Sequence, residues 1–198
     1  MRRPLFLALL TCAGLMAARP ALATSITFSP STVNVGVGSS SSVDILVSNR
    51  GGVTIGGFGF DVLFNSADIS VTSVNYGTDL GNPTDSSQTI VSTDLSVSGD
   101  ASLLDLSLLS TSSLSALQTT DSFLLARINF TGKTPSISSL QFSNLDFTDA
   151  AGNVLSVTPA GGTVDVLAST AVPEPGTMLL MGSGLMLVAR RMRSRKIR

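Results

Sequence analysis

The stretch IGGFGFDVLF, residues 55–64, decides the fold class of this chain. Every second position carries an apolar side chain that we expect in the core: Phe58, Phe60, Val62 and Phe64. The positions between them point the other way, toward water: Gly57, Gly59, Asp61 and Leu63. Successive side chains of an extended strand alternate between two faces, so this period of two predicts a half-buried strand.

The same alternation recurs along the chain, in residues 43–47, 104–108 and 124–130, and predicts further strands with one face in the core and the other in water. Shorter candidates are residues 32–37, 69–76, 89–93, 137–142 and 163–167. Glycine, asparagine and proline clusters separate these runs, and residues 113–117 are the one plausible helical turn. The pattern predicts an all-β fold, a single jelly-roll sandwich of about nine strands over residues 24–168.

The first 23 residues have the features of a secretory signal peptide. Arg2 and Arg3 precede an apolar run at residues 5–18, and the Ala21-Leu22-Ala23 triplet supplies a cleavage site before Thr24. The alternatives are an anchor that is never cleaved and a lipoprotein site at Cys12. Cleavage after Ala23 would remove Cys12, the only cysteine, and with it any disulfide or thiolate site.

The charge of the chain is divided between a body and a tail. The formal total is −1, but most basic residues lie in the signal peptide or beyond residue 189. The body keeps Arg50, Arg127 and Lys133 against twelve aspartates, a net charge of −9. Such an acidic body repels phosphates, which argues against nucleic acid as a partner.

The C-terminal stretch has three parts with different compositions. Residues 169–176 read as an extended linker that contains Pro-Glu-Pro, residues 177–189 are apolar, and residues 190–198 are strongly basic. A helix over 177–189 would span roughly 20 Å, against about 30 Å for the hydrocarbon core of a bilayer. We therefore expect a short transmembrane helix that anchors weakly, with its basic tail in the cytoplasm.

This stretch resembles the PEP-CTERM sorting signal, through Val172-Pro173-Glu174-Pro175, the apolar run and Arg190-Arg191. The resemblance implies an exosortase-type enzyme that cuts near the triplet in a Gram-negative bacterium. The protein would be anchored transiently in the inner membrane and then reach the cell surface or an exopolysaccharide matrix. The alternative is a plain stop-transfer anchor.

The body resembles a cohesin domain of the carbohydrate-binding-module-like superfamily over most of residues 26–167. The similar segments are ITFSPSTVNVGVGSSSSVDILVSN, IGGFGFDVLFNSADISVTSV, SFLLARINFTG and LDFTDAAGNVLSVTPAGGTVDV. The chain departs from the family at Phe64-Asn65-Ser66, where many cohesins carry a Tyr-Asp-Pro turn. The resemblance assigns no binding residues.

Catalytic chemistry has little support in the composition. The chain has no histidine, and its single glutamate, Glu174, lies in the sorting signal. We expect no catalytic residues, no cofactor and no metal site. Calcium at Asp146, Asp149 and Asn153 is conceivable, but the spacing fits no EF-hand loop, and a β-turn explains the same residues.

We therefore expect a non-catalytic surface or matrix module with a structural or adhesive role in the exopolysaccharide layer. The alternative is a recognition module that binds carbohydrate or a dockerin-like protein. Sugar binding usually needs exposed flat rings, and the body has no tryptophan and one tyrosine, Tyr76.

Overall fold

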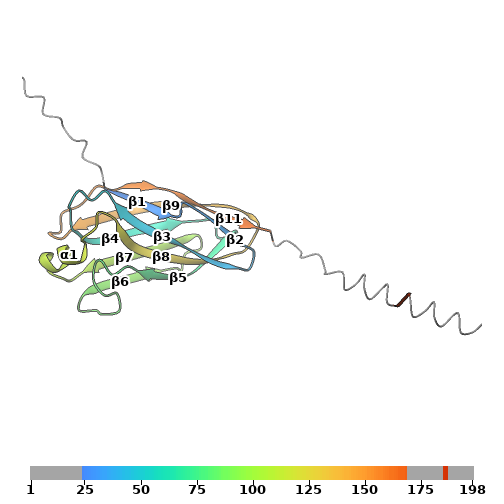
Figure 1. Ribbon diagram of the computed structural model, residues 1–198, viewed down its shortest axis with the longest axis horizontal. Coiled ribbons are helices and arrows are strands. Elements are labelled where there is room, and N and C mark those ends of the chain that lie inside the picture. Colours follow the sequence, from blue (N-terminus) through green and yellow to red (C-terminus); the bar gives the residue numbers. More distant parts are fainter. Residues whose placement is uncertain (1–23, 169–184, 187–198) are drawn as a thin grey trace, which may run out of the picture.

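A computed structural model describes residues 24–168 and 185–186 (Figure 1). Two β-sheets pack face to face with one short helix, which confirms the all-β sandwich, although the described chain has eleven strands and not about nine. The elements are β1 (Ser25–Ser29), β2 (Thr32–Gly36), β3 (Ser40–Ser48), β4 (Ile55–Leu63), β5 (Ile69–Tyr76), β6 (Thr89–Asp94), β7 (Asp100–Ser107), α1 (Thr111–Leu117), β8 (Phe123–Gly132), β9 (Ser136–Asp149), β10 (Thr158–Ala160) and β11 (Gly162–Leu167).

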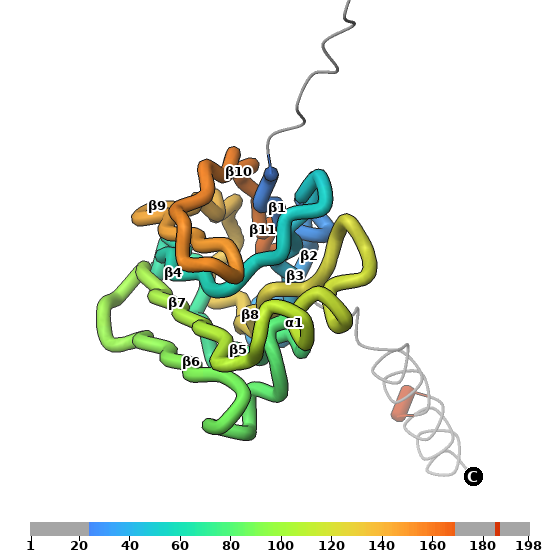
Figure 2. The backbone as a smooth tube through the Cα atoms, turned by 90° about the vertical axis from the view of Figure 1, so that its left-hand side faces the viewer, coloured from blue at the N-terminus to red at the C-terminus, as the bar shows by residue number. Residues whose placement is uncertain are grey.

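The two extra strands arise because both ends of the body switch sheets. The five-stranded sheet has the order β10-β1-β3-β8-β5, and the six-stranded sheet has the order β2-β11-β9-β4-β7-β6. Strand β1 pairs in parallel with β10, and β2 pairs in parallel with β11. Figure 2 views the two layers from the end that carries α1. The first and last segments of the body are thus hydrogen-bonded to each other in both sheets.

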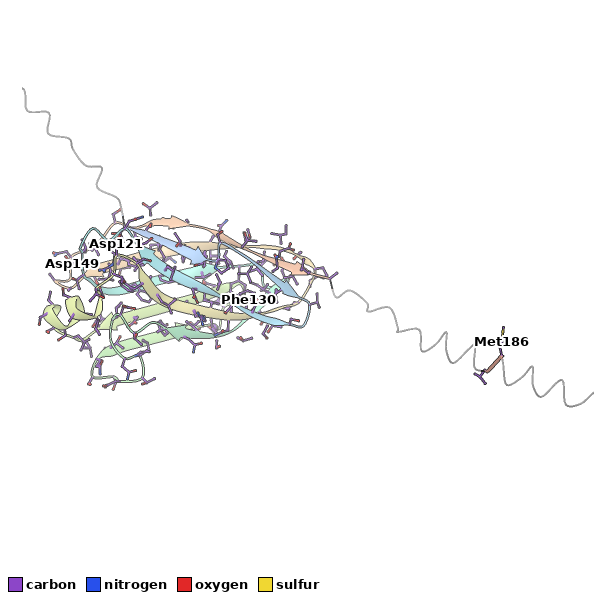
Figure 3. All side chains as sticks on the ribbon, in the orientation of Figure 1. Asp121, Phe130, Asp149 and Met186 are labelled. Carbon is purple, nitrogen blue, oxygen red and sulfur yellow. The ribbon has the colours of Figure 1, made fainter. Side chains whose placement is uncertain are left out.

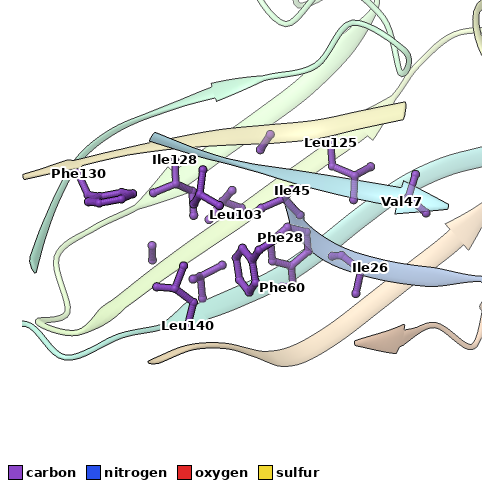
Figure 4. Packing of buried hydrophobic residues seen from close by; sticks show 14 of the residues in the cluster. Ile26, Phe28, Ile45, Val47, Phe60, Leu103, Leu125, Ile128, Phe130 and Leu140 are labelled. Atoms are coloured by element: carbon purple, nitrogen blue, oxygen red, sulfur yellow. The ribbon is translucent and has the colours of Figure 1, made fainter. Parts of the chain in front are cut away.

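The core lies between the sheets and is rich in phenylalanine (Figure 4). Phe28 of β1 stacks on Phe142 of β9 with ring centroids 4.2 Å apart. Phe60 of β4 meets Phe142 edge-on at 5.5 Å and stacks on Phe147 at 6.2 Å. Pairs of aromatic rings in these geometries add to the free energy gained by burying their area.

The alternation predicted for residues 55–64 is confirmed in β4. Phe58, Phe60 and Val62 are at most 3% exposed, and Phe64 packs partly buried against the same core. The run at residues 43–47 behaves in the same way, with its three alternate apolar residues buried in β3.

The assignment of faces at residues 104–108 is wrong. Leu104, Leu106 and Leu108 are 43–49% exposed, whereas Asp105 is 1% exposed. Strand β7 instead buries Ala101 and Leu103, which lie at the other parity. The antiparallel register of β7 on β4 fixes this choice, because the inward side chains of β4 require inward partners opposite them.

Strand β9 is longer than the expected strand at residues 137–142. The period of two breaks near Asn144, which has a positive φ of 50°. Asp61 pairs with Ser143 while Gly59 pairs with Asp146, so β9 has one extra residue here, a β-bulge. Before the bulge, the even-numbered residues Ser138 and Leu140 face the core. Beyond it, β9 continues to Asp149 and the odd-numbered Phe147 faces the core.

The expected helical turn is confirmed as α1, which begins two residues earlier. The hydroxyl of Ser110 caps it by accepting a hydrogen bond from the N–H of Ser113 at 3.3 Å. Its C-terminal end is held by Arg50, a cation that is only 5% exposed. Arg50 donates to the side-chain and backbone oxygens of Gln118 and lies 5.0 Å from the ring centre of Phe123.

Candidate functional site

The outer surface of the six-stranded sheet carries adjacent apolar side chains on its central and edge strands. Ile90 on β6 pairs with Leu106 on β7, and Leu106 pairs with Gly57 on β4. Leu104 pairs in the same way with Gly59. Directly opposite residues of neighbouring strands lie on the same face of a sheet. We call the surface formed by these five residues the leucine face.

The leucine face is open to solvent. Ile90, Leu104 and Leu106 are 49%, 43% and 44% exposed. Leu63 at the end of β4 and Leu108 just beyond β7 are exposed as well. A single exposed apolar side chain is ordinary, but a contiguous exposed patch marks a surface where another molecule binds.

A groove of about 140 Å³ runs over β4 within the leucine face. Its open floor is at Gly59, because the side chains of Leu106 and Thr148 lie over the neighbouring Gly57. Because β4 lies between β7 and β9, Leu104 and Leu106 form one wall, and Asp146 and Thr148 form the other. The groove therefore has one apolar wall and one polar wall.

A carboxyl group faces the core directly behind the leucine face. Asp105 lies between Leu104 and Leu106 and accepts a hydrogen bond from the hydroxyl of Thr89, which is 2% exposed. Burial raises the pKa of Asp105, and the hydrogen bond from Thr89 partly opposes this shift.

The same strands have an acidic margin next to the leucines. Asp61 on β4 pairs with Ser102 on β7, and Ser102 pairs with Asp94 on β6. Asp100 begins β7 nearby, and its pKa is raised first by burial and then by the charges of Asp61 and Asp94. Asn144 donates to Asp61 at 2.5 Å, but it brings no positive charge.

None of the three basic residues within residues 24–168 lies on β4, β6, β7 or β9. Arg127 is on β8 in the other sheet, Arg50 is buried beside α1, and Lys133 follows β8 and donates to the carbonyl oxygen of Ser66. Lys133 lines a pocket together with Asp100, but no basic residue lies on the strands that carry Asp61 and Asp94. The leucine face and this part of its margin are therefore complementary to a partner surface that is apolar and basic.

The outer surface of the five-stranded sheet is different, because its polar side chains bind one another. Arg127 donates twice to Asp44, with N–O distances of 2.5 and 2.8 Å, and these hydrogen bonds lower the pKa of Asp44. Polar pairs also cross its strands: Ser25 with Ser48, Ser40 with Thr131, and Asn129 with Ser73 and Asn75. This surface satisfies its own hydrogen-bonding groups.

Solved structures of cohesins superpose on the body. The seventh type I cohesin of ScaB from Pseudobacteroides cellulosolvens has a TM-score of 0.61 at 18% identity, covering 77% of this chain and 97% of that one. A type I cohesin from Clostridium thermocellum, in complex with a dockerin, has a TM-score of 0.60 at 17% identity, covering 73% and 99%. The sixth cohesin of scaffoldin B from Acetivibrio cellulolyticus, in complex with a mutant dockerin, has a TM-score of 0.57 at 18% identity, covering 73% and 99%. The body has a cohesin-like fold.

The C-terminal stretch matches a family model. Residues 171–196 fit the PEP-CTERM protein-sorting motif, and the match includes the Pro-Glu-Pro triplet and the Arg190-Arg191 pair. The motif indicates an exported protein that is anchored transiently in a membrane. No curated protein matches this sequence.

The suspected calcium ligands of the cohesin-like body have separate roles. The carboxylate of Asp149 accepts hydrogen bonds from the backbone of Ala151 and from the backbone and side chain of Asn153, each at 2.8 Å, and these bonds lower its pKa. Asp146 lies in the groove wall. Figure 3 shows Asp149 and Asp121 at the end of the sandwich that carries α1. The described part of the chain has no cluster of three or more candidate metal ligands.

Tyr76 does not offer its ring to a ligand. Its hydroxyl is hydrogen-bonded to the Thr93 hydroxyl at 2.8 Å and to the Ser92 carbonyl oxygen, both on β6. Its ring centre lies 6.3 Å from that of Phe58. Tyr76 therefore links the edge strands of the two sheets. Within residues 24–168 no aromatic side chain is exposed.

The predicted processing sites lie at or beyond the edges of the described body. The carbonyl of Thr24 accepts a hydrogen bond from the N–H of Thr158 at 2.8 Å, while Ala21 and Ala23 lie outside the described residues. The six sorting residues also lie outside them: Val172, Pro173, Glu174, Pro175, Arg190 and Arg191. Cleavage before Thr24 and the individual roles of the sorting residues stay predictions.

Only two residues of the expected transmembrane helix at 177–189 are described. Leu185 and Met186 are helical and exposed (Figure 3). Across residues 24–168 and 185–186, no helix has the length and apolar character needed to cross a membrane.

Sequence reasoning missed the leucine face. The alternation at residues 104–108 led us to place its leucines in the core. Yet residues 101–106 carry apolar side chains at both parities, which is typical of a strand that is apolar on both faces. Such a strand, combined with glycines at the outward positions of residues 57–59, is the sequence signal that points to the site.

Proposed function

We propose that this chain is an exported, exosortase-processed surface protein whose cohesin-like body recognises a protein partner without catalysing a reaction. It acts in the exopolysaccharide layer of a Gram-negative bacterium, where binding of that partner gives it an adhesive role. The leucine face is the observation that carries this proposal.

The chemistry of the leucine face favours a protein partner. Protein interfaces combine a well-packed apolar centre with a polar rim. Ile90, Leu104 and Leu106 supply such a centre, and Asp61 and Asp94 supply part of the rim. Two of the three cohesins named above were solved with a dockerin bound. We extend that mode of binding to this chain and propose a dockerin-like protein as its partner.

Carbohydrate is the less favoured partner, because a sugar-binding surface usually stacks flat rings on the apolar faces of sugars. The aromatic rings of residues 24–168 are buried or half-buried instead. The lack of histidine and the position of the single glutamate outside the body support a role without catalysis.

The sorting step is tested by replacing Pro173-Glu174-Pro175 with Ala-Gln-Ala. The apolar run and basic tail are unchanged, so membrane insertion should continue, while cutting near the triplet should stop. We expect full-length protein to accumulate in the inner membrane, as measured by cell fractionation and intact mass. Replacement of Arg190 and Arg191 by glutamine is the control and should reduce insertion. Equal release of the triplet variant and the wild type would contradict processing at this motif.

Protein recognition is tested with a photo-crosslinking amino acid at Leu104 in the exported protein. We expect a discrete conjugate with one surface protein. The same crosslinker at Ile137, which is 70% exposed but lies at the opposite end of β9 from the groove, should give no such conjugate. A conjugate that resists protease and is degraded by glycosidases would overturn the protein proposal in favour of a polysaccharide.

The crosslinked protein then allows a quantitative test. Leu106→Asp should weaken its affinity for the full-length chain in detergent micelles by at least about tenfold, because a charge would be buried in the apolar centre of the interface. Ile137→Asp should leave the affinity unchanged. Equal affinities for both variants would show that the leucine face is not the binding surface.

A further inference from the structure

We infer that the groove over β4 receives an arginine side chain of the partner. This inference rests on the proposed function, since it names the group that the leucine face recognises. It follows from the shape of the floor, the contrast between the two walls, and the absence of positive charge on the strands that form the groove.

The floor is open at Gly59, where β4 carries a glycine that its backbone conformation does not require. Gly57 and Gly59 have no positive φ, so any residue could adopt their backbone conformation. A Cβ atom added at Gly59 would meet nothing closer than 4.0 Å, which is ordinary van der Waals contact. Glycine inside a strand lowers stability and is typical of a place where another group approaches the backbone closely. The uncovered peptide at Gly59 is a flat surface suited to a planar guanidinium group, whereas Gly57 lies under Leu106, whose Cδ1 would be 2.9 Å from an added Cβ.

The two walls match the two parts of an arginine side chain. Leu104 and Leu106 offer methyl groups along which the three methylenes can pack. Asp146 pairs with Gly59 in the sheet, so its carboxylate stands on the outer face at the opposite wall, where a guanidinium can donate two hydrogen bonds to it. The hydroxyl of Thr148 adds an acceptor on the same wall.

The carboxylate of Asp146 is available for this contact. The single ion pair of the described chain joins Arg127 to Asp44 on the other sheet, so Asp146 has no cationic partner within residues 24–168. Asp61 lies one pleat further along β4 on the same face and adds negative potential. A cation in the groove would therefore meet attraction from two carboxylates and repulsion from no basic residue of the neighbouring strands.

The inference is tested by NMR titration of the isotope-labelled full-length chain in detergent micelles with N-acetyl-arginine amide. We expect saturable shifts confined to the amides of residues 57–59, 104–106 and 146–148. N-acetyl-citrulline amide has the same shape without the charge and should produce no saturable shifts. Asp146→Asn should weaken binding of the arginine probe by at least about tenfold, the usual scale for a charged hydrogen-bond pair.

Two further variants separate the groove from general effects. Gly59→Val should fill the groove and abolish the shifts, with thermal unfolding confirming that the variant is folded. Asp165→Asn removes the same charge from β11 of the same sheet and should leave probe affinity unchanged. Shifts elsewhere on the protein, or equal probe affinity in Asp146→Asn and wild type, would overturn the inference. If Leu106→Asp still weakens partner binding in that case, only the arginine assignment fails and the proposed function stands.

Discussion

The two outer surfaces of this sandwich are built by the same alternation of side chains but have opposite chemistry. On the five-stranded sheet, cross-strand pairs such as Asp44 with Arg127 and Asn129 with Asn75 use the polar groups of the surface. On the six-stranded sheet, Leu104 and Leu106 project into solvent beside carboxylates that have no cationic partner within residues 24–168. The polar side chains of the five-stranded surface pair with one another, whereas the six-stranded surface leaves its apolar side chains exposed and its carboxylates without a cationic partner within residues 24–168.

This difference supports the proposal that the partner binds on one side of the sandwich. A sandwich needs one apolar face on each sheet for its core, and extra apolar residues on an outer face lower solubility without adding to that core. The leucine face is therefore best explained by a partner that covers it. The surface with Asp44 and Arg127 has the chemistry of an ordinary solvated sheet.

The largest expected effect is a difference in the free energy of unfolding between variants of two neighbouring leucines of β7. Leu103→Ala should lower the free energy of unfolding by about 2–5 kcal/mol, because Leu103 is 1% exposed in the core. Leu104→Ala should change it by less than about 1 kcal/mol, because Leu104 projects into solvent. Chemical denaturation of both variants measures the two values. Equal losses would mean that Leu104 also packs in the core and that the leucine face does not exist.

A smaller effect concerns the carboxyl group behind the leucine face. The folded-state pKa of Asp105 is raised above its unfolded value of about 3.9, so the folded state binds its proton more tightly. This contribution to stability is full below the unfolded pKa and is lost as the pH rises through the folded pKa. Asp105→Asn should therefore raise stability at neutral pH and flatten the pH dependence above pH 4.

The measurement for Asp105 is a series of denaturant unfolding curves between pH 4 and pH 8. Asp85→Asn is a suitable control, because Asp85 lies in an exposed turn and its pKa is lowered, chiefly by the side chain of Ser87. That variant should lose stability at neutral pH, the opposite sign. A neutral-pH loss of stability in Asp105→Asn would show that the hydrogen bond from Thr89 outweighs the cost of burying the charge.

The smallest expected effect is on the other surface. Arg127→Gln removes the bidentate pair with Asp44, but half of the Arg127 side chain is exposed, so water and salt replace much of the interaction. We expect a slightly lower unfolding temperature at low salt and no difference from wild type at 1 M salt. Binding of the partner should be unchanged. Weaker partner binding in this variant would show that both surfaces take part in recognition.

Much of the fold was predictable because its strands obey a simple period. Phe58, Phe60 and Val62 could be assigned to the core from spacing alone, since the residues between them are glycine or aspartate. The helical turn before β8 was predictable for a related reason, because Leu114 and Leu117 have helical spacing. The tail was readable without any structure, because its sorting motif is local in sequence.

The site was not predictable, because it depends on which strands become neighbours. Residues 101–106 are apolar at both parities, and only pairing with β4 decides that Leu103 faces inward and Leu104 outward. Only the bulge at Asn144 moves Asp146 to the outer face beside Gly59. Periodicity records the conformation of one strand, whereas the leucine face and its groove arise from the register between strands. The sequence alone therefore determined an exported all-β module with a sorting tail. Tertiary structure decided which of its two outer surfaces exposes apolar side chains for a partner to cover.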